Sequence, residues 1–355
     1  MRVAIVGAGV MGCTTALSLA ARGVDVTLLE RSVPGAEASS AAAGILGAQA
    51  ELHRRADDVA TFVAARAAWG PWARELREHT GIDVGHRVSG VLRVARTGDE
   101  RAALAEEVAW QTARSLRASL LDGAAARQIE PELSPDVVAA AHFPEDAQVD
   151  PPALLRALMA AAARSSFVTV RAGATVERLV VESDRCVGVM LDGAPFRADA
   201  VVLAAGSWSS LVAGLPADMP AVRPVRGQIV LLDERPPRAR TIVFGGDCYV
   251  VPRGDGRVLC GSTMEHAGFR KEVTAQGLHT ILSGAIACVP SLAAAQFAGA
   301  WSNFRPHAAG DRPLIGPSPM AGLFLATGHY RNGILLSKVT ADAVARVVVG
   351  PAPTG

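Results

Sequence analysis

Lysine and long apolar segments are scarce in this 355-residue chain. Of 35 basic residues only Lys271 and Lys338 are lysine, and 34 acidic residues leave a net charge of +1. Such a balance builds no basic surface for a polyanion, so nucleic acid is not expected as a partner. Outside the N-terminus no uncharged apolar stretch approaches the roughly 18 residues of a membrane helix, so no membrane partner is expected either.

The N-terminal segment and the cysteines both bear on the compartment in which the protein works. Residues 3–21 are nearly free of charge and could be taken for an export signal. However, Gly7, Gly9 and Gly12 would weaken the helix of a signal peptide and suit a strand, a turn and a helix. The 5 cysteines, an odd number, show no CxxC or metal-ligand spacing. We therefore expect free thiols, no metal site and a cytoplasmic location.

The spacing of apolar residues predicts an α/β protein with an antiparallel block in its second half. Strands are expected at residues 2–6, 24–30, 87–95, 200–205, 227–232, 241–252 and 257–262, and helices at 10–22, in a region ending near 80, at 99–114 and at 153–163. The strand at 2–6, the helix at 10–22 and the strand at 24–30 form a βαβ unit. Gly254, Asp255 and Gly256 predict a hairpin turn. Asp150 stands before two prolines, which predicts a helix that starts there with Asp150 as its cap.

A glycine-rich turn in the βαβ unit indicates a dinucleotide. Gly7 permits the turn after the strand, Gly9 lets a pyrophosphate approach the backbone, and Gly12 lets the helix pack on the strand. Glu30 ends the next strand, where its carboxylate can accept hydrogen bonds from ribose hydroxyls and repels a 2′-phosphate. This motif alone does not decide between NAD and FAD.

Two further segments favour a flavin. Residues 39–51 (SSAAAGILGAQAE) place small side chains directly after the second strand. Residues 328–336 (GHYRNGILL) place a loop before the C-terminal helix. The N-terminus of that helix offers backbone N–H groups and a positive dipole end to the electron-rich edge of a reduced flavin ring.

With these motifs the chain resembles the glycine oxidase branch of the D-amino-acid oxidase superfamily of FAD enzymes. The resemblance is carried by SAAAGILGAQAE (40–51), DCYVVPR (247–253), GSTME (261–265), WSNFRP (301–306), DRPLIG (311–316) and GHYRNGILL (328–336). Sarcosine oxidases of the same superfamily hold their flavin on a cysteine near the C-terminus. No cysteine follows Cys288 here, so the resemblance implies noncovalent FAD.

The resemblance also implies roles for individual residues. Tyr249 and Arg305 are expected to bind the substrate carboxylate, with Arg331 beside them and Met264 in the pocket wall. FAD contacts are expected at Gly7, Gly9, Val10, Met11, Gly12, Glu30, Arg31, Ser39, Ser40, Ala43, Gly44, Ile45, Val176, Gly206, His329, Tyr330, Arg331, Asn332, Gly333, Ile334 and Leu335. Asp247 replaces a usual histidine and Ile45 a usual methionine, which leaves the exact substrate open.

Each of these side chains has a structural alternative. Arg305 could form a buried ion pair, Arg331 could touch only flavin or solvent, and Tyr249 could simply pack in the core. His329 could be a catalytic base, although a role in satisfying the backbone beside the flavin loop is preferred.

The predicted fold is α/β plus antiparallel β, a Rossmann-like FAD-binding domain with a discontinuous antiparallel-sheet substrate domain. Residues 1–85, 140–222 and 306–355 are assigned to the FAD-binding domain, and 86–139 and 223–305 to the substrate-binding domain. The implied reaction is oxidation of glycine or a small D-amino or N-methyl amino acid by hydride transfer to flavin, giving an imine.

Hydrolysis of that imine gives a 2-oxo acid and ammonia, O2 becomes H2O2, and the implied pathway is thiamine thiazole biosynthesis. The alternatives are an amino-acid dehydrogenase or a natural-product amine oxidase on the same fold, and a flavin-binding subunit without catalysis. The sequence leaves open whether the protein is a homo-oligomer.

Overall fold

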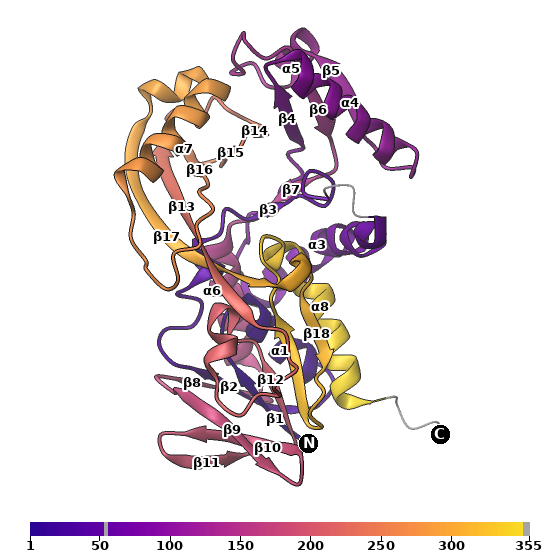
Figure 1. Ribbon diagram of the computed structural model, residues 1–355, viewed down its shortest axis with the longest axis vertical. Coiled ribbons are helices and arrows are strands. Elements are labelled where there is room, and N and C mark those ends of the chain that lie inside the picture. The colour runs from indigo at the N-terminus through magenta and orange to yellow at the C-terminus, as the bar shows by residue number, and fades with distance from the viewer. Residues whose placement is uncertain (53–55, 351–355) are drawn as a thin grey trace.

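The computed structural model describes residues 1–52 and 56–350, which build two large sheets. Figure 1 shows the six-stranded sheet in one half of the elongated molecule and the eight-stranded sheet in the other. Two long paired strands, β13 (Val222–Asp233) and β17 (Gln296–Ala308), belong to the eight-stranded sheet and reach down to the other half. No helix within the described ranges is long and apolar enough to cross a membrane.

The six-stranded sheet has the order β18-β19-β12-β1-β2-β8 and is parallel except for β18. Its strands are β1 (Arg2–Val6), β2 (Asp25–Glu30), β8 (Val168–Ala172), β12 (Ala200–Leu203), β18 (Leu314–Pro317) and β19 (Leu323–Thr327). Helices α1 (Val10–Ala20), α3 (Val59–Thr80), α6 (Pro151–Arg164) and α8 (Gly333–Val349) form its helical layer. The central strand β1 is apolar and buried after its first residue because other elements cover both of its faces.

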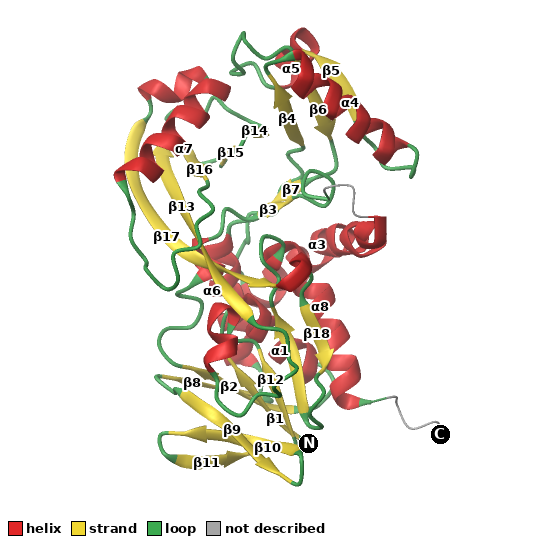
Figure 2. Cartoon of the chain, viewed as in Figure 1, coloured by secondary structure: helices red, strands yellow, loops and turns green. Residues whose placement is uncertain are grey.

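The eight-stranded sheet has the order β17-β13-β16-β15-β14-β4-β6-β5. Its other strands are β4 (Val91–Ala95), β5 (Ser119–Asp122), β6 (Ala139–Phe143), β14 (Ile242–Gly245), β15 (Cys248–Pro252) and β16 (Arg257–Gly261). All neighbours are antiparallel except β4 and β14. Figure 2 shows α7 (Ala275–Cys288) against the strands next to β17, and α4 (Gly98–Thr112) and α5 (Gly123–Ile129) against the other end.

Smaller elements complete the fold. A three-stranded sheet contains β9 (Val176–Glu182), β10 (Arg185–Leu191) and β11 (Ala194–Arg197), and a short pair joins β3 (Ile45–Leu46) to β7 (Ala147–Gln148). Helix α2 (Ala38–Ala41) follows β2. All five cysteines are buried free thiols.

The eight-stranded sheet takes its strands from residues 91–143 and 222–308, and the six-stranded sheet takes its own from before, between and after these segments. The predicted α/β unit and the predicted antiparallel block therefore interleave along the chain. The predicted domain boundaries remain a proposal, and the one at residue 140 falls within β6, which belongs to the eight-stranded sheet.

Some local predictions were wrong in detail. The strand predicted at 87–95 begins only at Val91, because Gly90 has a φ of +67° and Arg87 forms no more than an isolated bridge to Gln148. The strand predicted at 241–252 is a hairpin of β14 and β15, which turns at Gly246 with a φ of +57°.

Asp150 is the N-cap residue of α6, as the sequence predicts, and the helix begins at Pro151. Its side chain nevertheless makes no capping bond. The carboxylate instead accepts a charged hydrogen bond of 2.8 Å from Arg257.

Candidate functional site

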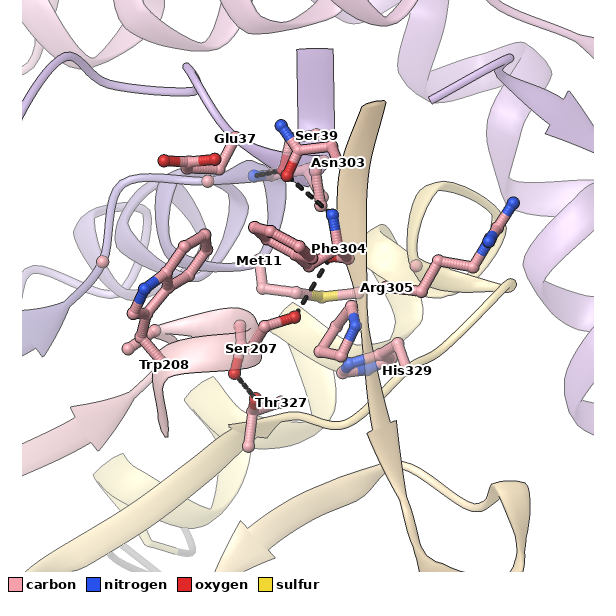
Figure 3. Close-up of a pocket in the computed structure, with 18 of the residues that line it drawn as sticks. Met11, Glu37, Ser39, Ser207, Trp208, Asn303, Phe304, Arg305, Thr327 and His329 are labelled. Atoms are coloured by element: carbon pink, nitrogen blue, oxygen red, sulfur yellow. Dashed lines mark hydrogen bonds between the residues drawn. The ribbon is translucent and has the colours of Figure 1, made fainter. Parts of the chain in front are cut away.

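A cavity of about 500 Å³ lies where the two sheets meet. One side is formed by the loops that follow β1, β2, β12 and β19, and the other by β13, β15 and β17. Figure 3 shows how Met11, Ser39, Trp208 and Arg305 reach this cavity from elements far apart in the sequence. Its position at the carboxyl ends of parallel strands is the usual place for a ligand in an α/β sheet.

The three glycines of the N-terminal turn serve different purposes. Gly7 has a φ of +101°, and a Cβ there would lie 2.6 Å from the carbonyl oxygen of Ala204. A Cβ on Gly12 would lie 1.9 Å from the carbonyl oxygen of Gly7, so Gly12 lets α1 pack against the turn and lies outside the cavity lining. Gly9 lines the cavity, where a Cβ would meet only the Ser39 hydroxyl within 4 Å.

Polar groups around this turn suit a dinucleotide. The Glu30 carboxylate accepts hydrogen bonds from the N–H groups of Ala8 and Ser32, both at 3.0 Å, which fixes it at the end of β2. The Ser39 hydroxyl accepts from the Val10 N–H at 2.9 Å, at the start of α1. Ribose hydroxyls and a pyrophosphate are the groups that such a carboxylate and such a helix start bind.

Trp208 was not predicted, yet it forms part of the same end of the cavity. The Arg31 guanidinium lies 4.0 Å from the centre of its indole ring. Phe269 and Phe304 pack against the other parts of the ring, with centroids at 5.4 and 5.8 Å. The sequence signal was its position directly after the strand that ends before Gly206.

The loop of small residues after β2 is held in place from the eight-stranded sheet. The Trp301 indole N–H donates to the carbonyl of Ala41 at 3.0 Å, and the Arg253 guanidinium donates to the carbonyl of Ala43 at 2.6 Å. Arg253 is 93% buried, and burial lowers its pKa to about 10. The shape of this part of the cavity therefore depends on both sheets.

The opposite end of the cavity carries Tyr249, Arg305, Tyr330 and Arg331. The Arg305 guanidinium donates to the Ser262 hydroxyl at 2.5 Å and to the Thr263 carbonyl at 3.1 Å. Among the described residues Arg305 makes no salt bridge, so the alternative of a structural ion pair is not supported. Within the part of the chain that the structure describes, no carboxylate pairs with its positive charge.

Arg331 differs from Arg305 in this respect. Its guanidinium forms an ion pair of 3.0 Å with Glu51, which was not predicted as a site residue although it ends the segment 40–51. The same carboxylate is the main cause that raises the pKa of Arg331. The charges of Arg331 and Glu51 largely cancel, which leaves Arg305 as the stronger site for an anion.

Tyr249 is 8% exposed, and burial raises the pKa of its phenol. The phenol is therefore protonated at neutral pH and can donate a hydrogen bond. Since Tyr249 lines the cavity beside Arg305, core packing does not account for it alone.

His329 is buried, and its Nε2 lies 3.0 Å from the hydroxyl of Thr340. Burial lowers its pKa to about 3, so the imidazole is neutral. These observations support a structural role for His329 over that of a catalytic base. Its observed side-chain partner is the Thr340 hydroxyl and not a backbone group.

The start of α8 also faces the cavity. Gly333 and Ile334 line it, and the N-cap Asn332 makes no side-chain capping bond. The first N–H groups of the helix and its positive dipole end are therefore directed toward the cavity, as the sequence predicts.

The structure brings together most of the residues predicted for the site. The lining includes Gly7, Gly9, Val10, Met11, Glu30, Arg31, Ser39, Ala43, Gly44, Ile45, Val176, Gly206, Tyr249, Arg305, His329, Tyr330, Arg331, Gly333 and Ile334. Other predicted residues lie outside it, namely Gly12, Ser40, Met264, Asn332 and Leu335. Met264 is 54% exposed and touches the site only through the hydroxyl of Tyr330, which donates to its sulfur. Asp247 is exposed at the turn between β14 and β15 and also lies outside the lining.

Comparison with known proteins agrees with this geometry. The family described as FAD dependent oxidoreductase (DAO) matches residues 2–347. Glycine oxidase of Geobacillus kaustophilus is 37% identical over 98% of this chain and 92% of that protein. A crystal structure of glycine oxidase from that organism has a TM-score of 0.94 at 36% identity, covering 98% of this chain and 95% of that one. The predicted fold class is confirmed.

Two other proteins are similar to this chain over almost its whole length. The bifunctional protein ThiO/ThiG of Trichormus variabilis is 36% identical over 98% of this chain, which spans 52% of that protein. The crystal structure of iminodiacetate oxidase from Chelativorans sp. BNC1 has a TM-score of 0.89 at 28% identity, covering 100% of this chain and 97% of that one. The likeness therefore extends along the whole chain in each case.

Proposed function

The chain belongs to the family of FAD-dependent oxidoreductases (DAO), and from this we propose that it oxidises glycine or a small D-amino or N-methyl amino acid. FAD is its cofactor, as the sequence predicts. The cavity fits this group, since Gly9 leaves room for a pyrophosphate and the fixed carboxylate of Glu30 suits a ribose. No cysteine is among the described lining residues, which supports noncovalent attachment.

The observation that carries the proposal is that Arg305 has no carboxylate partner among the residues the structure describes. A planar guanidinium binds a carboxylate through two parallel charge-assisted hydrogen bonds, and a substrate carboxylate can take that position. The phenol of Tyr249 is protonated and can donate a further bond to the same carboxylate. These two side chains would orient the substrate so that its Cα–H faces the interior of the cavity.

When bound, FAD supplies the two-electron acceptor for the hydride that leaves Cα. The residues described here orient and hold the substrate. Neutral His329 is hydrogen-bonded to Thr340 and is not available as a base. Loss of a hydride and a proton converts the amino acid to an imine. Water then gives the 2-oxo acid and ammonia, while O2 takes the two electrons and two protons to become H2O2.

The cellular setting is part of the proposal. The likeness to the ThiO/ThiG proteins supports a role in thiamine thiazole biosynthesis, in which the imine of glycine would be the useful product. Five buried free thiols are in keeping with a cytoplasmic location.

Anaerobic mixing of the purified yellow protein with a panel of amino acids tests the proposal. Glycine is expected to bleach the flavin absorption, and air is expected to restore it with one H2O2 per turnover. Bleaching without rapid recovery in air would instead indicate a dehydrogenase. Failure of every amino acid to bleach the flavin would indicate a flavin-binding subunit without catalysis.

A further inference from the structure

Arg305 is held by neighbours to which the proposed function assigns no role. Its guanidinium donates to the Ser262 hydroxyl at 2.5 Å and to the Thr263 carbonyl at 3.1 Å. The phenolic oxygen of Tyr249 lies against the residue before Ser262, since a Cβ built on Gly261 would lie 2.6 Å from it. The segment Gly261–Thr263 therefore lies against both groups that we assign to the substrate carboxylate.

The residues after Ser262 fix its position on the sheet. The Thr263 hydroxyl accepts from the backbone N–H of Gln228 at 3.0 Å. The backbones of Glu265 and Arg226 exchange two hydrogen bonds of 2.9 Å, and their side chains form an ion pair in which Arg226 is 4% exposed. Ser262 is thus anchored to β13 and supplies a fixed point for Arg305.

Gly227 on β13 provides the open surface against which the guanidinium lies. A Cβ built there would lie 2.2 Å from Nη1 of Arg305 and 2.5 Å from its Cζ and Nη2. The φ of Gly227 is outside the left-handed region, so alanine would strain no backbone. Its nearest obstacles are the atoms at the flexible end of Arg305, and these are what an added methyl group would displace.

We propose that Ser262 is a positioning residue that holds Arg305 beside Tyr249, so that the two side chains act as one carboxylate-binding unit. The Ser262 oxygen accepts from the guanidinium, and Tyr249 is paired with the preceding residue, Gly261, across β15 and β16. The phenolic O–H of Tyr249 can donate to the same substrate carboxylate. This role rests on the proposed function, because it is defined by the binding of a carboxylate beside the flavin.

Ser262→Ala in the FAD-loaded protein is the first test. The KM for glycine and the Kd of acetate, read from the perturbed flavin spectrum, are expected to rise about tenfold. The kcat at saturating glycine is expected to change less than about threefold, since the lost bond acts on binding. Ser262→Thr keeps a hydroxyl and should restore most of the affinity.

A matched control removes a buried serine hydroxyl elsewhere. Ser134 is 3% exposed and its hydroxyl accepts from the N–H of Asp136, away from the cavity lining. Ser134→Ala is expected to leave both the KM and the Kd of acetate unchanged.

Gly227→Ala is the second test, because it displaces the guanidinium without removing it. The Kd of acetate is expected to rise at least tenfold while the FAD content stays at the wild-type level. If Ser262→Ala is purified without FAD, this variant still measures whether the position of the guanidinium sets the affinity for acetate. Wild-type affinity for acetate in either variant would overturn the proposal, and so would a wild-type protein that does not bind acetate.

Failure of the two proposals can be told apart. If the wild-type protein binds acetate but glycine does not reduce its flavin, the proposed reaction is wrong. The acetate titrations of Ser262→Ala and Gly227→Ala still measure whether Ser262 positions the carboxylate-binding unit.

Discussion

At one end of the cavity the chain offers the glycine-rich turn and small side chains between Gly7 and Ser39, joined by Trp208 from a later segment. At the other end it offers the larger side chains of Tyr249, Arg305 and Arg331, which come from separate segments. Cofactor binding at the first end depends on the absence of side chains, whereas substrate binding at the second end depends on side chains that are present. A substitution should therefore damage the first end by adding atoms and the second by removing them.

Adding atoms at the glycine-rich end is expected to have the largest effect. Gly9→Leu would place a side chain where the pyrophosphate has to lie, so the protein should be purified with less than about a tenth of the wild-type FAD. The ratio of flavin to protein absorption measures this. Gly98→Leu, at a position where a Cβ meets nothing within 4 Å, should keep its FAD. Full occupancy in Gly9→Leu would falsify the assignment of this end to the pyrophosphate.

Removing the guanidinium at the other end should spare the cofactor and impair the substrate. Arg305→Ala is expected to lower kcat/KM for glycine by a factor of roughly 30 to several thousand, which corresponds to about 2–5 kcal/mol for a charge-assisted contact. Arg305→Lys should recover only part of this, because a point charge cannot form two parallel bonds. Arg223→Ala removes an exposed arginine on β13 and serves as the control. Near-normal turnover in Arg305→Ala would exclude Arg305 from the site.

The loop after β19 serves both ends, and its neutral His329 should make stability depend on pH. The imidazole has a pKa of 6.5 in the unfolded chain and of about 3 in the folded protein. At a pH between these two values, it is therefore protonated only in the unfolded chain. Acidification from pH 7.5 to 5 should therefore cost roughly 2 kcal/mol of unfolding free energy through this residue. The free energy of unfolding, measured in urea at both pH values, should fall less on acidification in His329→Gln than in the wild type, by that amount. In His266→Gln, which changes an exposed histidine, it should fall as much as in the wild type. Equal losses in all three proteins would contradict a neutral buried His329.

The smallest expected effect concerns the balance of charge at the substrate end. Glu51→Gln removes the partner of Arg331, so the site becomes more positive and the Kd of acetate should fall about threefold. The spectral titration used for Ser262→Ala measures this. A weaker affinity for acetate would show that Glu51 stabilises the arrangement of Arg331 more than it repels the ligand.

Local signals made the glycine-rich end predictable from the sequence. A strand, three spaced glycines, a helix and Glu30 lie within the first 30 residues. The residues that the turn requires to be glycine are therefore close to it in the sequence. Local context does not reveal the partner of a side chain when that partner is distant in the sequence. Asp150 is the N-cap residue of α6 as predicted, but its carboxylate binds Arg257 on β16.

The substrate end depends on strand register, which the sequence does not display. Tyr249 and Gly261 are paired residues on β15 and β16, and Gly227 lies on β13 opposite β17, which carries Arg305. A resemblance could point to Tyr249 and Arg305, but Ser262 has a function only once these strands are aligned. Met264 shows the reverse case, since it belongs to a recognisable segment but is 54% exposed and is not part of the lining.

The interleaving of the two sheets sets an order of events during synthesis. Strand β1 pairs with β12, β12 pairs with β19, and the start of α8 completes the cavity wall. At about 5–20 residues per second the ribosome needs on the order of tens of seconds between making the glycine-rich turn and making α8. For more than half of that interval β1 lacks its partner β12, and to the end of it the cavity lacks the start of α8. FAD should therefore stabilise chains that include α8 more than chains that stop before it.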